Sequence, residues 1–279
     1  MNKINNKGVI AFLIVLLSMP LGHAAMILME HFLKGTLLNI AAFLLGVFGL
    51  ILTYIGSLTS KDIKSTLLGF FGSLLVWTGW IEFGYMYFAN KLAVAPIIEN
   101  GEITTKPEYL LMMSSIGFLI IFNLFYIFKI KNGCTMYSSI QRKIKIKTPS
   151  LNTTISTNKS FTTFMESTML LWTSYLLLMF AYDKDILGDR HPLTIAIAMG
   201  CLIWSIFLFR KLIKIKTIGP AIRYALPTVI IFWTFVEVMG RIGIMKEIWV
   251  NPLQYKLEMI VMLSVMFICF IYIRFKKLN

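Results

Sequence analysis

The sequence alternates between long apolar runs and short polar segments. Each apolar run is about 20 residues long, which is the length that an α-helix needs to cross the roughly 30 Å hydrocarbon core of a bilayer. The runs cover 9–33, 36–58, 65–90, 108–130, 161–183, 192–210, 218–242 and 256–274. They do not alternate strictly between polar and apolar residues, as the strands of a membrane β-barrel do. The pattern therefore predicts an all-α integral membrane protein, an eight-helix transmembrane bundle.

Composition and charge agree with this prediction. Of the 279 residues, 57% are hydrophobic and 14% are charged, which is outside the range of soluble proteins. Of the 27 Lys and Arg residues, 19 fall at the helix ends that share a side with the N-terminus. This positive-inside bias predicts that both termini are cytoplasmic, in a plasma (inner) membrane. The net charge of +14 is therefore explained mostly by the basic residues that set the membrane topology. We expect the partner of these residues to be the lipid bilayer and not nucleic acid.

A polar segment divides the chain. Residues 131–160 are rich in Ser, Thr, Asn and Lys and are interpreted as a basic cytoplasmic linker between a first four-helix half, 1–130, and a second, 161–279. An even number of crossings in each half would make the two halves parallel. Trp77-Thr78 with Glu82 is echoed by Trp233-Thr234 with Glu237, although the Trp-to-Glu spacings are five and four. This echo is weak support for an internal duplication.

The first apolar run also has features of a secretory signal peptide. Lys3 and Lys7 precede an apolar stretch, and Gly22-His23-Ala24 is an acceptable cleavage sequence. The apolar run nevertheless continues to Leu33, which favours retention of residues 1–24 as part of a spanning helix.

Ionisable side chains concentrate in the outer halves of the predicted helices. A charge at mid-membrane costs at least about 2.5–3.5 kcal/mol on insertion scales, so these groups need partners. Histidine with carboxylate is a ligand set for zinc or iron, and nearby methionines would admit copper. We therefore expect a divalent or redox metal ion (iron, copper or zinc) in a site that opens to the extracytoplasmic face. Its candidate ligands are His23, Glu30, Glu82 and Glu237.

Such a site predicts an oxidative or hydrolytic enzyme acting on a small or lipid-soluble substrate. His31 would be an auxiliary ligand or base, and Tyr85 and Arg241 would orient the substrate. An acidic turn would form the lid or entrance; its residues are Asp183, Asp185, Asp189 and His191.

Other interpretations remain open at this point. An ion- or proton-coupled transporter would use Glu82 and Glu237 as its titrating groups. A non-catalytic membrane subunit of a redox complex would use the same residues to bind a quinone, a haem or a membrane partner subunit. Glu237 and Arg241 are four residues apart on one predicted helix and could simply pair. The sequence contains no P-loop, nucleophile elbow, dinucleotide-binding fingerprint or His-Glu-x-x-His motif.

Overall fold

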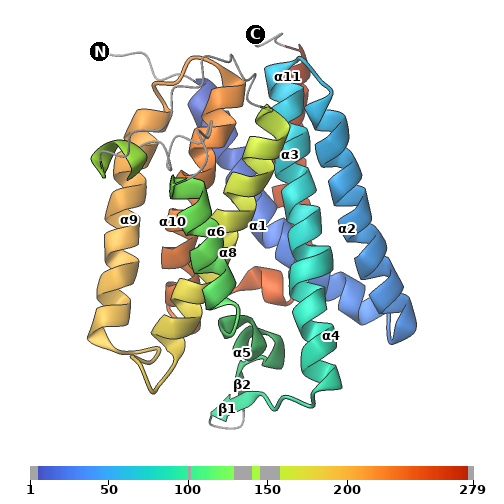
Figure 1. Cartoon of the computed structure of the whole chain (residues 1–279), viewed down its shortest axis with the longest axis vertical. Helices are drawn as coiled ribbons and strands as arrows, with labels where there is room; N and C mark the ends of the chain where they lie inside the picture. The colour runs from blue at the N-terminus through green and yellow to red at the C-terminus, as the bar shows by residue number, and fades with distance from the viewer. Residues whose placement is uncertain (1–5, 100–101, 129–139, 145–157, 276–279) are drawn as a thin grey trace. The chain divides into compact units, whose positions relative to one another are not determined.

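The protein is almost entirely helical in a computed structural model that describes residues 6–99, 102–128, 140–144 and 158–275. The helices of the first part of the chain are α1 (Asn6–Phe32), α2 (Thr36–Ser57), α3 (Asp62–Val76), the π-helix η1 (Trp77–Glu82), α4 (Phe83–Lys91), α5 (Pro107–Met113) and α6 (Ile116–Phe128). Those of the second part are α8 (Lys159–Tyr182), α9 (Pro192–Leu212), α10 (Ile218–Arg241), the short 3₁₀ helix η2 (Ile248–Val250) and α11 (Lys256–Phe275). Figure 1 labels the helices in chain order.

The predicted membrane spans are confirmed in their general form. Among the described residues, seven helices are long and apolar enough to cross a membrane, with α3, η1 and α4 forming one continuous span over residues 62–91. The count reaches eight when the bent pair α5 and α6 is taken as one span. The protein is therefore a multi-pass membrane protein, while the cytoplasmic placement of both termini stays a prediction. The predicted linker 131–160 lies outside the described residues, except for 140–144 and 158–160.

The predicted span 108–130 departs from a straight helix. Its two parts, α5 and α6, meet at an angle of 51°. The break contains two serines, and their hydroxyls donate to backbone carbonyls three residues earlier, Ser114 to Leu111 at 2.7 Å and Ser115 to Met112 at 2.6 Å. Side chains that bond back to the helix in this way compete with the regular ladder and favour bends. A small antiparallel hairpin, β1 (Ile97–Glu99) and β2 (Glu102–Thr105), precedes α5.

Backbone contacts divide the chain into two compact units. Unit 1 contains residues 1–38 and 181–279, and unit 2 contains residues 39–180. These boundaries differ from those of the predicted halves 1–130 and 161–279, which were placed from the composition of the linker alone.

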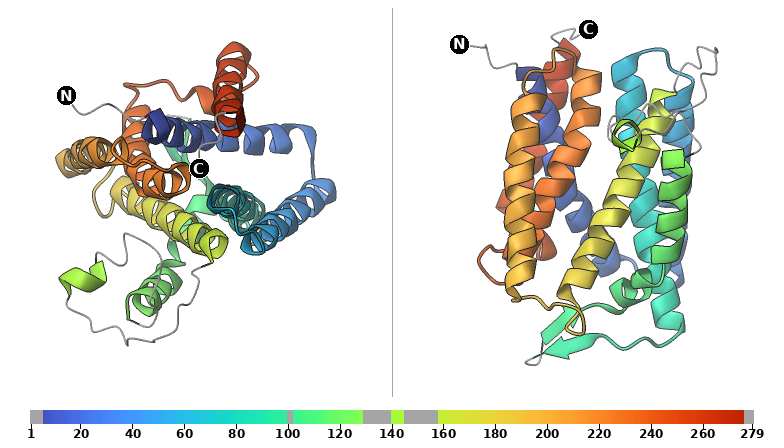
Figure 2. Two further views of the ribbon diagram at one scale, coloured as in Figure 1. Left: turned by 90° about the horizontal axis from the view of Figure 1, so that it is seen from above. Right: turned by 60° about the vertical axis from the view of Figure 1, so that its left-hand side comes forward.

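In unit 1 the most buried helix is α10, which lies between α1 and α9 (Figure 2). Its small and aliphatic side chains Ala221, Ala225 and Val229 are completely buried. The hydroxyl of Ser205 on α9 donates to the carbonyl of Thr228 on α10 at 2.9 Å, which satisfies a polar group inside the helix pair. Helix α1 also packs on α11 and η2, so α1 and α10 together form the centre of this unit.

Unit 2 is held together by glycines that let helices α2 and α3 approach closely. A Cβ atom built on Gly49 would lie 2.7 Å from the carbonyl oxygen of Gly72, and one on Gly79 would lie 2.5 Å from that of Ala42. Small residues of this kind drive helix association in lipid, where apolar side chains gain little from leaving the solvent. The Trp80 indole closes the seam by donating to the carbonyl of Phe43 at 3.0 Å.

A matched pair of glycine substitutions tests this seam. Gly49→Ala places a methyl group against backbone atoms and is expected to destabilise the protein by about 1–3 kcal/mol. Gly117→Ala on α6 meets nothing within 4 Å and is expected to be neutral or stabilising by up to about 1 kcal/mol, because alanine is the better helix former. Melting temperatures of the purified variants in detergent measure the difference. Equal melting temperatures for the two variants would contradict the packing.

Candidate functional site

The last two turns of α10 carry a row of polar residues. Trp233, Glu237 and Arg241 are spaced by four and therefore lie on one face of the helix. The indole Nε1 of Trp233 donates to Glu237 Oε1 at 2.7 Å, so the carboxylate is held along its own helix. This row fixes the position of one half-buried acid and one cation at the same end of unit 1.

Arg241 is held by the last residue of α8 and by the turn that follows α8. Its Nε donates to Asp189 Oδ2 at 3.1 Å, and both side chains are half-buried. Its guanidinium carbon lies 4.9 Å from the ring centroid of Tyr182, which is within the range of a cation–π contact. Arg241 thus ties the turn after α8 to the end of α10.

The loop after α10 folds back and adds a second acid. The backbone N–H groups of Ile244 and Met245 both donate to the carbonyl of Met239, and Gly243 adopts a positive φ of 80° that suits glycine. Farther along the loop, the buried ring of Trp249 packs on Trp233 at a centroid distance of 4.8 Å. These contacts return the loop to the helix that it has just left.

Glu247 occupies the space that Gly240 provides. A Cβ atom on Gly240 would lie 2.5 Å from Glu247 Oε1 and 2.7 Å from its Cγ, so the glutamate side chain rests directly on the backbone of α10. A larger residue at position 240 would displace this carboxyl. The absence of a side chain is therefore what brings Glu247 to the polar face of α10.

Burial raises the pKa of Glu247, which lies in the loop outside the spanning helices. The negative charge of Glu237 raises this pKa further, whereas His23 and Arg241 act in the opposite direction with smaller effects. The charges of Glu237, Glu247 and Asp189 in turn act on the hydroxyl of Tyr182. We call this group the α10 cluster; it consists of His23, Tyr182, Asp189, Glu237, Arg241 and Glu247.

Two atoms of the α10 cluster are buried and lack hydrogen-bond partners within the described part of the chain. They are the hydroxyl oxygen of Tyr182 and Oδ1 of Asp189. The first is a donor as well as an acceptor, and the second is an acceptor only. The cluster therefore retains hydrogen-bonding capacity beyond its internal contacts.

Glu82, Glu108 and Glu166 are buried acids of unit 2, and Glu82 is the one among them that was predicted as a site residue. Glu82 is 6% exposed and accepts a hydrogen bond from the hydroxyl of Tyr175 at 2.8 Å. The ring of Tyr175 also contacts Trp77 and Tyr109, with centroid distances of 5.2 and 5.9 Å. Glu82 is thus held by α8, whereas Glu237 is held by its own helix.

The two Trp-to-Glu spacings have a structural explanation. Residues Trp77–Glu82 form a π-helix, in which the N–H of Phe83 bonds to the carbonyl of Thr78 five residues back. A π turn contains one residue more than an α turn, so a spacing of five in η1 carries Glu82 about one turn from Trp77. A spacing of four does the same for Glu237 and Trp233 in α10. Single π turns inside helices are frequently found at functional sites.

The predicted site residues fall in several places. His23, Glu237, Arg241 and Asp189 belong to the α10 cluster in unit 1. Glu30 is half-buried near the end of α1, and His31 is exposed with its ring against Phe32. The half-buried Tyr85 belongs to unit 2 with Glu82, so the four-ligand set that combines Glu82 with residues of unit 1 stays a prediction.

The acidic turn contains residues with defined structural roles. Asp183 Oδ1 accepts from the backbone N–H of Asp185 at 2.9 Å, which stabilises the turn. His191 is the N-cap of α9, where its Nδ1 accepts from the N–H of Leu193 at 3.2 Å. Asp189 is the member of this turn that reaches the α10 cluster. The role of the turn as a lid remains a prediction.

Sequence reasoning missed Glu247, Tyr182 and Tyr175. For Glu247 a usable signal was present, because Gly240 and Gly243 flank the end of α10 and Trp249 follows at the end of a short loop. Such glycines indicate a tight return of the chain over the helix. No comparable signal in the sequence indicates that Tyr175 would meet Glu82.

Across the residues that the structure describes, no group of three or more His, Cys, Asp or Glu side chains is placed to hold a metal ion. The predicted metal centre therefore remains a prediction. Comparison of the chain with protein-family models, curated proteins and solved structures finds no match.

The raised pKa of Glu247 predicts a specific pH dependence of stability. In the folded protein the carboxyl holds its proton at pH values where the unfolded chain, with a pKa near 4.5, has already lost it. The folded state then binds more protons, so stability falls as pH rises above the unfolded pKa and levels off above the folded one. Glu247→Gln removes this penalty. The variant is expected to match the parent protein near the unfolded pKa and to melt at a higher temperature at neutral and higher pH.

Melting temperatures measured across this pH range check the expectation. Asp185→Asn is the matched control, since Asp185 is exposed in the turn after α8, and its melting curve should run parallel to that of the parent protein. A Glu247→Gln variant whose melting temperature stays parallel to the parent at every pH would refute the account.

Proposed function

We propose that this multi-pass membrane protein binds a cation in exchange for a proton at the Glu237–Glu247 carboxyl pair, as an ion- or proton-coupled transporter does. The pair would lie at the extracytoplasmic end of unit 1, as the distribution of basic residues predicts. The observation that carries the proposal is the imbalance of charge in the α10 cluster.

That imbalance follows from the composition of the cluster. It contains three carboxyl groups and one guanidinium, and the guanidinium is already bound to Asp189. When His23 is neutral, the cluster has an excess of two negative charges. An excess of this size in a half-buried site requires protons or cations, because like charges that are close together and poorly solvated cannot both stay ionised.

The exchange step balances in charge and in atoms. With Glu247 protonated, its O–H bond breaks, the proton leaves to water, and a monovalent cation takes its place beside the two carboxylates. The total charge of the cluster is then unchanged. His23 acts electrostatically on Glu247, and its imidazole is a neighbouring group that can accept and pass on the proton.

The structure of α10 supports a role in transport. Pro227 lies inside this helix, ten residues before Glu237, or about 15 Å by helix rise. A proline removes one backbone hydrogen bond and weakens the ladder of the preceding turn. The hydroxyl of Thr228 donates to the carbonyl of Tyr224 at 2.8 Å beside this point. Helix α10 is continuous, and the proline gives it a locally weakened turn between its buried middle and the Glu237 end.

The metal-dependent enzyme inferred from the sequence has less support. It requires several ligands around one ion, and the described residues offer no such group. Exchange of a proton for a cation at the carboxyl pair does not require a group of three or more such ligands. We therefore prefer cation–proton exchange to oxidative or hydrolytic catalysis.

Proteoliposomes with a pH-sensitive dye inside provide the test. Sodium, potassium, lithium and tetramethylammonium chlorides are added outside in separate experiments, and at least one is expected to raise the internal pH as protons leave. The double variant Glu237→Gln/Glu247→Gln is expected to give the response of liposomes without protein, because neither position can then release a proton.

Asp185→Asn serves as the control and is expected to retain the full response. A response in the double variant equal to that of the parent protein would contradict the assignment of the carboxyl pair. No response of the parent protein to any of the four salts would contradict the exchange itself.

A further inference from the structure

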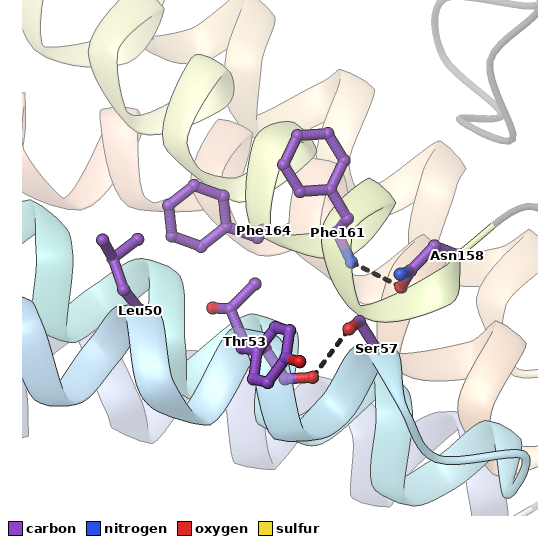
Figure 3. A pocket seen from close by; sticks show the side chains of 7 residues that line it. Leu50, Thr53, Ser57, Asn158, Phe161 and Phe164 are labelled. Atoms are coloured by element: carbon purple, nitrogen blue, oxygen red, sulfur yellow. Dashed lines mark hydrogen bonds between the residues drawn. The ribbon is translucent and has the colours of Figure 1, made fainter.

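A groove in unit 2 runs between α2 and the start of α8. Its volume is about 340 Å³, which is at the lower end of the roughly 300–1,000 Å³ typical of ligand pockets. Figure 3 shows the side chains that line it. They are Leu50, Thr53, Tyr54 and Ser57 of α2, Asn158 just before α8, and Phe161 and Phe164 of α8.

The lining changes from polar to apolar along the helices. Ser57 and Asn158 stand where α2 ends and α8 begins, and Leu50 and Phe164 lie one to two turns farther in (Figure 3). Asn158 Oδ1 accepts from the N–H of Phe161 at 3.2 Å, which fixes the start of α8. The groove therefore has a polar mouth and an apolar floor, the same order of polarity as a phospholipid.

The walls of the groove are aromatic and open to the outside. Tyr54 is 65% exposed and Phe161 is 53% exposed, although both belong to membrane-spanning helices. Beneath them Ser160 donates to the carbonyl of Thr53 at 2.9 Å and holds the two helices together. The same serine occupies the space that a Cβ atom on Gly56 would fill. The helices are thus joined below the groove and separated by aromatic side chains above it.

Basic residues flank the lining residues of the polar mouth in the sequence. Lys61 and Lys64 follow the end of α2 and are exposed, and Lys159 adjoins Asn158. Lys159 pairs with Asp62 at 2.9 Å, which leaves an excess of two positive charges among these four residues. An anionic group at the mouth would be attracted, and the predicted topology places this end of the helices in the cytoplasmic leaflet, where anionic lipids are found.

We propose that this groove binds an anionic glycerophospholipid, with one acyl chain between α2 and α8 and the phosphate head group beside Lys61 and Lys64. The apolar floor of the groove accommodates the acyl chain, and the lysines attract the phosphate head group. The proposal is independent of cation–proton exchange, since none of its residues belongs to the α10 cluster.

The head-group part is tested by native mass spectrometry of the purified protein in detergent with equal amounts of dioleoyl-phosphatidylglycerol and dioleoyl-phosphatidylcholine. The parent protein is expected to retain phosphatidylglycerol preferentially. Lys61→Gln/Lys64→Gln is expected to reduce this preference by about fivefold for each lysine removed. Equal retention of the two lipids by the parent protein would overturn the anionic assignment.

The chain part is tested with substitutions that fill or open the groove. Leu50→Trp places a large ring in it and is expected to lose the retained lipid, whereas Leu44→Trp, on the exposed face of the same helix, is expected to keep it. If Leu50→Trp does not fold, Phe161→Ala is compared with Phe118→Ala, another exposed phenylalanine, on α6. Phe161→Ala removes one wall and is expected to lower retention. Equal retention within the folded pair would overturn the groove as the binding site.

Discussion

A carboxylate beside hydrocarbon needs a proton, a counter-charge or strong hydrogen-bond donors, and this requirement determines the polar structure of both units. Glu237 accepts a hydrogen bond from the indole of Trp233, and Asp189 forms an ion pair with the guanidinium of Arg241. Glu82 accepts a hydrogen bond from the hydroxyl of Tyr175. Glu247 remains the least compensated of these acids, because its burial and the nearby negative charge of Glu237 both disfavour its ionised form. For this reason the proposed exchange of a proton for a cation centres on Glu247 and its neighbour.

The helical membrane fold could be predicted because the length and hydropathy of a span are properties of a continuous stretch of sequence. Seven of the eight predicted runs correspond to continuous spans. The run 108–130 has the same hydropathy but bends at Ser114 and Ser115, whose hydroxyls bond back to the helix. Hydropathy records how apolar a residue is and not where its hydroxyl donates, so the bend could not be read from the pattern.

The candidate site was predicted in part for a similar reason. The four-residue spacing of Trp233, Glu237 and Arg241 places them on one helix face, and this face is the basis of the α10 cluster. Contacts between segments do not follow from spacing. Arg241 meets Asp189, 52 residues away, and Tyr175 meets Glu82, 93 residues away. Glu247 was missed because its position depends on how the chain turns after Gly240, which hydropathy does not report.

The π-helix Trp77–Glu82 shows how a membrane-spanning helix can accept the insertion of one residue during evolution. One added residue in an α-helix rotates everything beyond it by about 100°, which would turn the outer half of a packed helix towards lipid. A π turn absorbs the added residue locally, so the side chains of α4 keep their facing relative to α3. A membrane helix can therefore gain one residue while the side chains on its buried face continue to point towards the same neighbours.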